Sequence, residues 1–158
     1  MAERIVVNTG PLITLARADL LEVVGKLPFT FVCPTQVTEE IAEGVSLGYP
    51  EVKPKWLSAV ALSRSVDPVA QATLDLGEAA VIALALEQKI SRVCIDERKG
   101  RAAAAAVGLK VTGSLGLLAR ARTLGLVPAL RPLVERLVQV GAFYDEELIR
   151  RILEAFGE

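Results

Sequence analysis

The stretch that decides the fold is Leu76–Arg101, LGEAAVIALALEQKISRVCIDERKGR. Its first half predicts a buried helix, because apolar residues recur at i, i+3, i+4 and i+7 from Ala79 onward. A short strand is expected at Arg92–Asp96, and it ends on an acid. In α/β layer structures, ligands bind at the carboxyl ends of parallel strands. Asp96 therefore lies where a functional residue is expected, and Glu78 lies in the first turn of the preceding helix.

The composition is that of one ordinary domain. The chain has 158 residues, 52% of them hydrophobic, and a mean hydropathy of +0.43. No apolar run approaches the roughly 20 residues that span a bilayer, and the start of the chain lacks a signal-peptide pattern. We expect one cytoplasmic domain over residues 1–158, with the helices from about residue 128 packed on it. Cys33 and Cys94 lie in apolar runs and are expected to be free core thiols.

The absence of histidine excludes several kinds of active site. It removes Ser-His-Asp and Cys-His nucleophilic pairs and imidazole as a general base. For an enzyme working near neutral pH, this leaves carboxylates with a metal ion, or lysine chemistry. The net charge of -1 gives no global basic field for nucleic acid, so any such binding needs a local patch.

Strands and helices are expected to alternate along the chain. This alternation predicts a mostly parallel sheet with helices on both faces. The further strands are expected at Arg4–Val7, Phe29–Cys33, Trp56–Leu62 and Leu109–Thr112. One helix is expected to begin at Asp67-Pro68 and to stop near Gly77, because Asp followed by Pro is typical of a helix start.

Four acid or amide side chains are expected to converge at the carboxyl edge of this sheet: Asn8, Glu40, Glu78 and Asp96. For Asp96 the structural alternative is a carboxylate that caps the following helix, and the functional interpretation is preferred because of its position. Considered alone, Glu40 and Glu78 are better interpreted as solvated helix carboxylates.

Three cations begin the helix after Asp96, namely Arg98, Lys99 and Arg101. Cations at a helix N-terminus oppose the helix dipole, which hints at a bound anion. A solvated charged face is the better interpretation of the cluster in isolation.

Four ordered segments resemble the PIN-domain superfamily. They are IVVNTGPLITLA (5–16), PTQVTEEIA (34–42), LGEAAVIALALE (76–87) and VCIDERKGRAAAAAVGLKVTGSLGLL (93–118). The nearest resemblance is to short stand-alone bacterial and archaeal proteins related to VapC-type toxins, and it covers about Arg4 to Arg122. It implies a three-layer α/β/α fold with a central parallel sheet, a ribonuclease activity that depends on Mg²⁺ or Mn²⁺, and an acidic cluster at the strand ends.

The resemblance also implies roles for individual residues. The family's acids fall on Asn8, Glu40, Glu78 and Asp96 as the catalytic set, and the last three of these are the implied metal ligands. The amide at Asn8 departs from the family's aspartate. Its oxygen can ligate a metal ion but adds no charge, so weaker metal binding is expected.

Small hydroxyl residues of the family fall on Thr9 and Ser114, near the acidic cluster. They are expected to contact RNA, together with the basic side chains of Arg98, Lys99 and Arg101. A metal held by the three carboxylates would activate water for attack on a phosphodiester, which needs no histidine.

The main hypothesis is therefore a metal-dependent ribonuclease, with the toxin half of a toxin-antitoxin pair as one role. Its expected partners are RNA, a small antitoxin protein and a second copy of the chain. Apolar residues of the last helices could form a dimer surface or simply pack in the core: Leu117, Leu118, Leu133, Leu137, Ile149 and Ile152. The alternatives are a PIN fold that binds RNA or protein without cutting, motivated by Asn8, and a domain that binds a small phosphorylated ligand. The last is the weakest, because no Gly-rich phosphate loop occurs at either strand-to-helix corner.

Overall fold

The computed structural model describes residues 2–158, and it contains a five-stranded sheet in which neighbouring strands are parallel. The strand order is β3-β2-β1-β4-β5, so β1 is central and the order reverses between β1 and β4. The bounds are β1 Glu3–Val7, β2 Phe29–Pro34, β3 Leu57–Val60, β4 Arg92–Cys94 and β5 Lys110–Thr112. A reversal of strand order opens a crevice at the carboxyl edge of a parallel sheet. Here that crevice begins immediately after Val7 and Cys94.

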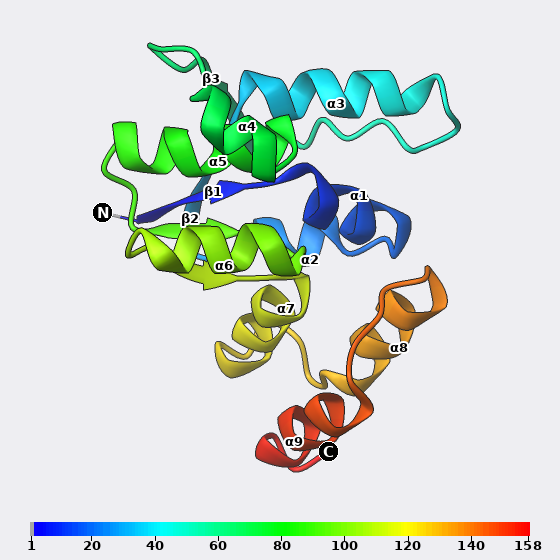
Figure 1. The fold of residues 1–158 in the computed structure, drawn as a ribbon. Helices are drawn as coiled ribbons and strands as arrows, with labels where there is room; N and C mark the ends of the chain where they lie inside the picture. Colours follow the sequence, from blue (N-terminus) through cyan, green and yellow to red (C-terminus); the bar gives the residue numbers. More distant parts are fainter. Residues whose placement is uncertain (1) are drawn as a thin grey trace.

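Helices cover both faces of the sheet, which gives the three layers of an α/β/α fold (Figure 1). On one face, α5 contacts α3, α4 and α6 as well as β1, β2 and β4; on the other, α7 contacts α1 and α2. The bounds are α1 Thr9–Arg17, α2 Leu21–Gly25, α3 Thr35–Val45, α4 Pro68–Thr73, α5 Leu76–Glu87, α6 Arg98–Ala106, α7 Ser114–Thr123, α8 Arg131–Gln139 and α9 Glu146–Ala155. The fold class expected from the alternation of strands and helices is confirmed.

The helix expected to begin at Asp67-Pro68 does begin there, but it ends at Thr73 rather than near Gly77. α4 ends at Thr73, and Leu74 has an extended backbone. Asp75 then caps α5, accepting a hydrogen bond of 2.7 Å from the backbone N–H of Glu78. An Asp at the cap satisfies one of the free N–H groups of a new first turn. This break places Glu78 at the start of α5.

The last helices pack into the same apolar core as the sheet. Leu137 and Leu153 belong to one cluster with Ile5 and Val93. The side chain of Glu158 accepts hydrogen bonds from the backbone N–H groups at the start of α8, at 2.8 Å from Leu130. Four of the leucines considered for a dimer surface are buried in this core, namely Leu117, Leu118, Leu133 and Leu137, so they are not available to a second copy. No helix within residues 2–158 has the length and apolar character needed to cross a membrane.

Candidate functional site

Asn8 lies at the crevice between β1 and β4. Its backbone N–H donates to the carbonyl of Cys94 at 3.0 Å, which joins the ends of the two strands. Asn8 occupies the cap position of α1, but its side chain makes no capping bond there. The residue is 4% exposed, and within residues 2–158 its Oδ1 has no hydrogen-bond partner. An unpaired buried polar atom costs about 1–3 kcal/mol, so such an atom indicates a place for a missing partner.

Glu40 brings a carboxylate from α3 to the start of α5. Its Oε1 is buried and has no partner among the described residues. The carboxylate lies directly on Gly77, where a Cβ would collide with it, so only glycine allows this approach. The pKa of Glu40 is raised by burial and then by the nearby carboxylate of Asp75. The Thr9 hydroxyl and the Gly77 N–H oppose this rise, although neither makes a hydrogen bond of proper geometry with it.

Glu78 adds a second buried carboxylate from the first turn of α5. The residue is 6% exposed, and its Oε2 has no partner within the described chain. This oxygen lies against Gly100 of α6, where a Cβ would collide with it. Burial raises the pKa of Glu78 to about 7, with further contributions from Asp75 and Glu97. A group with this pKa changes charge near neutral pH.

Asp75 is a member of the site that the sequence interpretation missed. It caps α5, and its charge contributes to the raised pKa values of both Glu40 and Glu78. It therefore lies within electrostatic reach of both carboxylates. The available signal was the spacing Asp-x-x-Glu, which is typical of a helix capping box. That pattern indicates a helix start and says nothing of Glu40, which approaches from a distant segment.

Asp96 follows β4, but both of its carboxylate oxygens already accept hydrogen bonds. Oδ1 accepts from the backbone N–H of Ser114 at 2.8 Å, and Oδ2 accepts from the Ser114 hydroxyl at 2.7 Å. Asp96 therefore holds the start of α7, where a negative charge is favoured by the helix dipole. If Asp96 were only a helix cap, the sequence indicated that it would cap the following helix, α6. In the structure it caps the later helix α7 instead. Ser114 is fully buried in this arrangement and holds Asp96 in place.

Asn8, Glu40 and Glu78 are connected by short links around the crevice. Thr9 follows Asn8 and lies beside Glu40, and Glu40 lies on Gly77, the residue before Glu78. Asp96 is displaced towards α7. Within residues 2–158, no three Asp, Glu or Cys side chains converge closely enough to form a ready metal-binding group.

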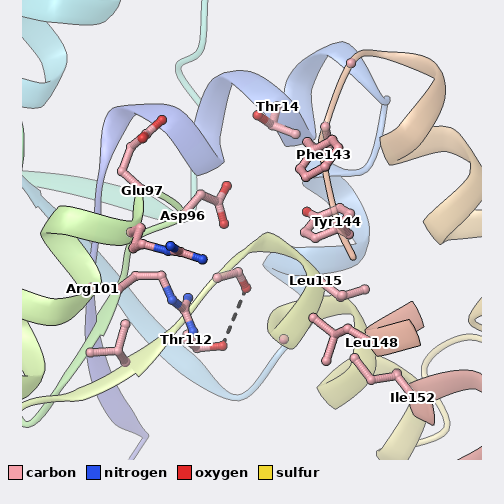
Figure 2. A pocket seen from close by; sticks show the side chains of 16 residues that line it. Thr14, Asp96, Glu97, Arg101, Thr112, Leu115, Phe143, Tyr144, Leu148 and Ile152 are labelled. Atoms are coloured by element: carbon pink, nitrogen blue, oxygen red, sulfur yellow. Dashed lines mark hydrogen bonds between the residues drawn. The ribbon is translucent and has the colours of Figure 1, made fainter. Parts of the chain in front are cut away.

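The three cations after Asp96 point to different places. Arg101 is partly buried, and its Nη1 donates to the carbonyl of Ile95 at 2.9 Å. Arg98 and Arg101 line a cavity of about 780 Å³ that also reaches Asp96 (Figure 2). Lys99 lines a separate hollow beside α4. The three cations therefore do not form one patch: Arg98 and Arg101 lie beside Asp96, and Lys99 lies on another side of α6.

Replacing Glu78 with glutamine is expected to stabilise the protein above about pH 7 and to have little effect below about pH 4.5. The pKa of Glu78 is about 7 in the folded protein, against 4.5 for an unperturbed glutamate, so the folded state retains the proton longer. The protonated Glu78 therefore contributes stability to the parent protein that is fully present below about pH 4.5 and is lost as the pH rises through about 7. The difference is on the order of 2 kcal/mol.

Urea unfolding of the parent and of Glu78→Gln in EDTA, at the two ends of this pH range, measures the effect. The exposed Glu39 gives a matched control, because Glu39→Gln should change stability little at either pH. Equal effects of Glu78→Gln at both ends would contradict a costly buried charge at this position.

The chain was compared with models of known protein families. The family model of the PIN domain matches residues 4–158, which is nearly the whole chain. A comparison with curated proteins finds no match. The match agrees with the three α/β/α layers of the fold. The chain therefore belongs to the PIN-domain family.

Proposed function

We propose that this protein is a ribonuclease that uses Mg²⁺ or Mn²⁺ to hydrolyse RNA phosphodiester bonds. The PIN domain is a nuclease-type fold, and PIN domains generally use divalent metals. The observation that carries the proposal is the set of buried, unpaired oxygen atoms on Asn8, Glu40 and Glu78 at the crevice between β1 and β4. A metal-dependent nuclease needs oxygen ligands of this kind to hold a hard cation next to its substrate.

The chemistry of these side chains fits a divalent cation. Every candidate donor is an oxygen, which Mg²⁺ and Mn²⁺ prefer. Burial, and then neighbouring carboxylates, raise the pKa values of Glu40 and Glu78, so a bound cation would stabilise their ionised forms. Glu40 and Glu78 would hold the ion with Asn8, and Asp96, which Ser114 holds towards α7, would have to turn from Ser114 to join them. When bound, the ion would activate a water molecule and stabilise the charge that develops on the phosphodiester.

The protein's own residues position this chemistry. Gly77 and Gly100 allow the carboxylates of Glu40 and Glu78 to approach the crevice. Asp75 holds the first turn of α5 through the N–H of Glu78. Arg98 and Arg101 place positive charge beside Asp96, where they would attract the phosphates of an RNA strand.

Cleavage of single-stranded RNA tests the proposal. The parent protein is expected to cut RNA with Mn²⁺ or Mg²⁺ and to stop when EDTA is added. Asp96→Asn is expected to cut more slowly, because it removes a charge beside the crevice and disturbs the contact with Ser114. If Asp96→Asn cleaves as well as the parent, Asp96 is not part of the site; if the parent never cleaves with either ion, the proposal is wrong.

A more specific proposal concerns the protein's role in the cell. As a cytoplasmic ribonuclease, the protein would suit the toxin half of a toxin-antitoxin pair, with a small antitoxin protein as its inhibitor and a homodimer as its working form. A small antitoxin-like reading frame in the adjacent gene would support the toxin role.

A second candidate function is a PIN domain that binds RNA or protein without cutting. Two observations favour it: the uncharged amide at Asn8, and the direction of both Asp96 oxygens towards Ser114. Under this alternative, the crevice would bind no metal ion, and the Arg98 region would still bind RNA.

A further inference from the structure

A cavity of about 780 Å³ lies beside the crevice, and its two walls differ in chemistry. One wall comes from the start of α6 and carries Asp96, Glu97, Arg98 and Arg101. The facing wall comes from the turn between α8 and α9, and Figure 2 shows Phe143 and Tyr144 there, across the space from Asp96 and Glu97. A volume of this size is typical of small-ligand sites.

The aromatic wall is unusual because Phe143 is 94% exposed. The Phe143 side chain therefore contributes almost nothing to the core. Its neighbour Tyr144 is half-buried and does pack against the core. An aromatic face exposed at the rim of a cavity offers a stacking surface for a planar ligand. Tyr144 also lines the cavity, and a tyrosine phenol, which is neutral at ordinary pH, can donate a hydrogen bond.

The charged wall carries side chains of both positive and negative charge. Arg98 is exposed and makes no ion pair or hydrogen bond within residues 2–158, so it is free to meet a phosphate. Arg101 is already held by the carbonyl of Ile95. Glu97, on the same wall, is exposed and repels phosphate, but it can accept hydrogen bonds from the N–H groups on a base edge. A nucleotide has the anion, the planar ring and the N–H donors that these walls would bind.

We propose that this cavity holds one nucleotide of a single-stranded RNA, with its base stacked on Phe143 and its phosphate paired with Arg98. The inference rests on the proposed function, because it takes RNA as the ligand. It extends that function by adding a base-binding subsite from the C-terminal helices to the metal crevice of the sheet. Glu97 lines the cavity and its charge also reaches Glu78, so a strand held in this cavity would lie close to the crevice.

The test is binding of a short fluorescent oligouridylate, measured by anisotropy in EDTA so that neither metal nor cleavage takes part. Phe143→Ala and Phe143→Leu are expected to bind about 5- to 150-fold more weakly, the range that loss of one base–aromatic stack produces. Phe143→Trp should bind as tightly as the parent, because it restores an aromatic face. Leu47, which is 78% exposed and lies outside the cavity, gives the matched control Leu47→Ala.

Arg98→Ala gives an independent readout. It should lower the slope of log affinity against log salt by about 0.7, the value for one phosphate contact on a single strand, whereas Phe143→Ala should leave that slope unchanged. The exposed Arg64, outside the cavity, serves as the control for loss of a positive charge.

Failure of this inference can be told apart from failure of the proposed function. If the parent cleaves RNA but Phe143→Ala and Phe143→Leu bind the oligonucleotide as tightly as the parent, the subsite is wrong and the nuclease stands. If these variants weaken binding as expected but the parent never cleaves, the subsite stands and the nuclease is wrong. If Phe143→Ala changes only the oligomeric state, Phe143 contacts protein and the nucleotide site is overturned.

Discussion

Glu40→Gln is expected to slow metal-dependent RNA cleavage by about 10²- to 10⁴-fold, because a metal ion contributes several kcal/mol of charge stabilisation and each 1.36 kcal/mol is tenfold in rate. Glutamine has nearly the same shape as glutamate, so the contact with Gly77 should survive. It removes the negative charge that, with Glu78, would hold the ion. Single-turnover cleavage of a labelled RNA at saturating Mn²⁺ measures the loss.

The stability of Glu40→Gln shows whether slower cleavage comes from loss of a metal ligand or from damage to the fold. The ionised Glu40 is raised in energy by burial and by Asp75, so Glu40→Gln should be at least as stable as the parent in EDTA. Glu39→Gln changes the preceding, exposed residue and should leave both rate and stability unchanged. Full activity in Glu40→Gln would remove Glu40 from the site, and a slow but strongly destabilised variant would assign it a structural role.

The sequence was sufficient for the fold because local signals and periodicity agreed. The alternation of short apolar strands with helices predicts a parallel sheet, and the ends of the strands at Val7 and Cys94 place Asn8 and Asp96 near one edge. The end of the helix that begins at Asp67-Pro68 was expected near Gly77, and it lies earlier, at Thr73. The local signal for the earlier boundary was the capping pattern of Asp75 and Glu78, which starts α5.

The site was predicted less completely because its contacts join distant segments. The bonds from Ser114 to Asp96 span 18 residues, and no local pattern indicates that this carboxylate faces α7 rather than α6. The influence of Asp75 on Glu40 depends on the packing of α3 against α5. Nothing in the sequence indicated a role for Phe143, because it is a lone aromatic residue in a turn. Its proposed role is visible only in the structure, where the charged residues at the start of α6 lie across the cavity from it.

Asn8→Asp is expected to make stability strongly dependent on metal. The new carboxylate would be buried at a 4% exposed position near Glu40, and in EDTA above about pH 7 it should cost on the order of 3 kcal/mol, through desolvation and like-charge repulsion. Mn²⁺ should reverse this loss, because a carboxylate replaces an amide as ligand and a ligand at 100 times its Kd adds about 2.7 kcal/mol.

Urea unfolding of the parent and of Asn8→Asp, each with EDTA and with Mn²⁺, measures both effects. Gln139→Glu makes the same amide-to-acid change at an exposed position of α8 and should show neither. If Mn²⁺ stabilises Asn8→Asp no more than the parent, Oδ1 of Asn8 does not face the ion.

Calorimetric titration of the parent with Mn²⁺, after removal of metal by EDTA and dialysis, tests the central claim most directly. We predict saturable binding at the crevice, with proton release that makes the heat depend on the buffer near neutral pH, because Glu78 must lose its proton to bind the ion. Glu78→Gln should weaken the binding and reduce the proton release. The absence of saturable Mn²⁺ binding by the parent, or equal binding by Glu78→Gln, would contradict a metal-dependent site formed by Asn8, Glu40 and Glu78.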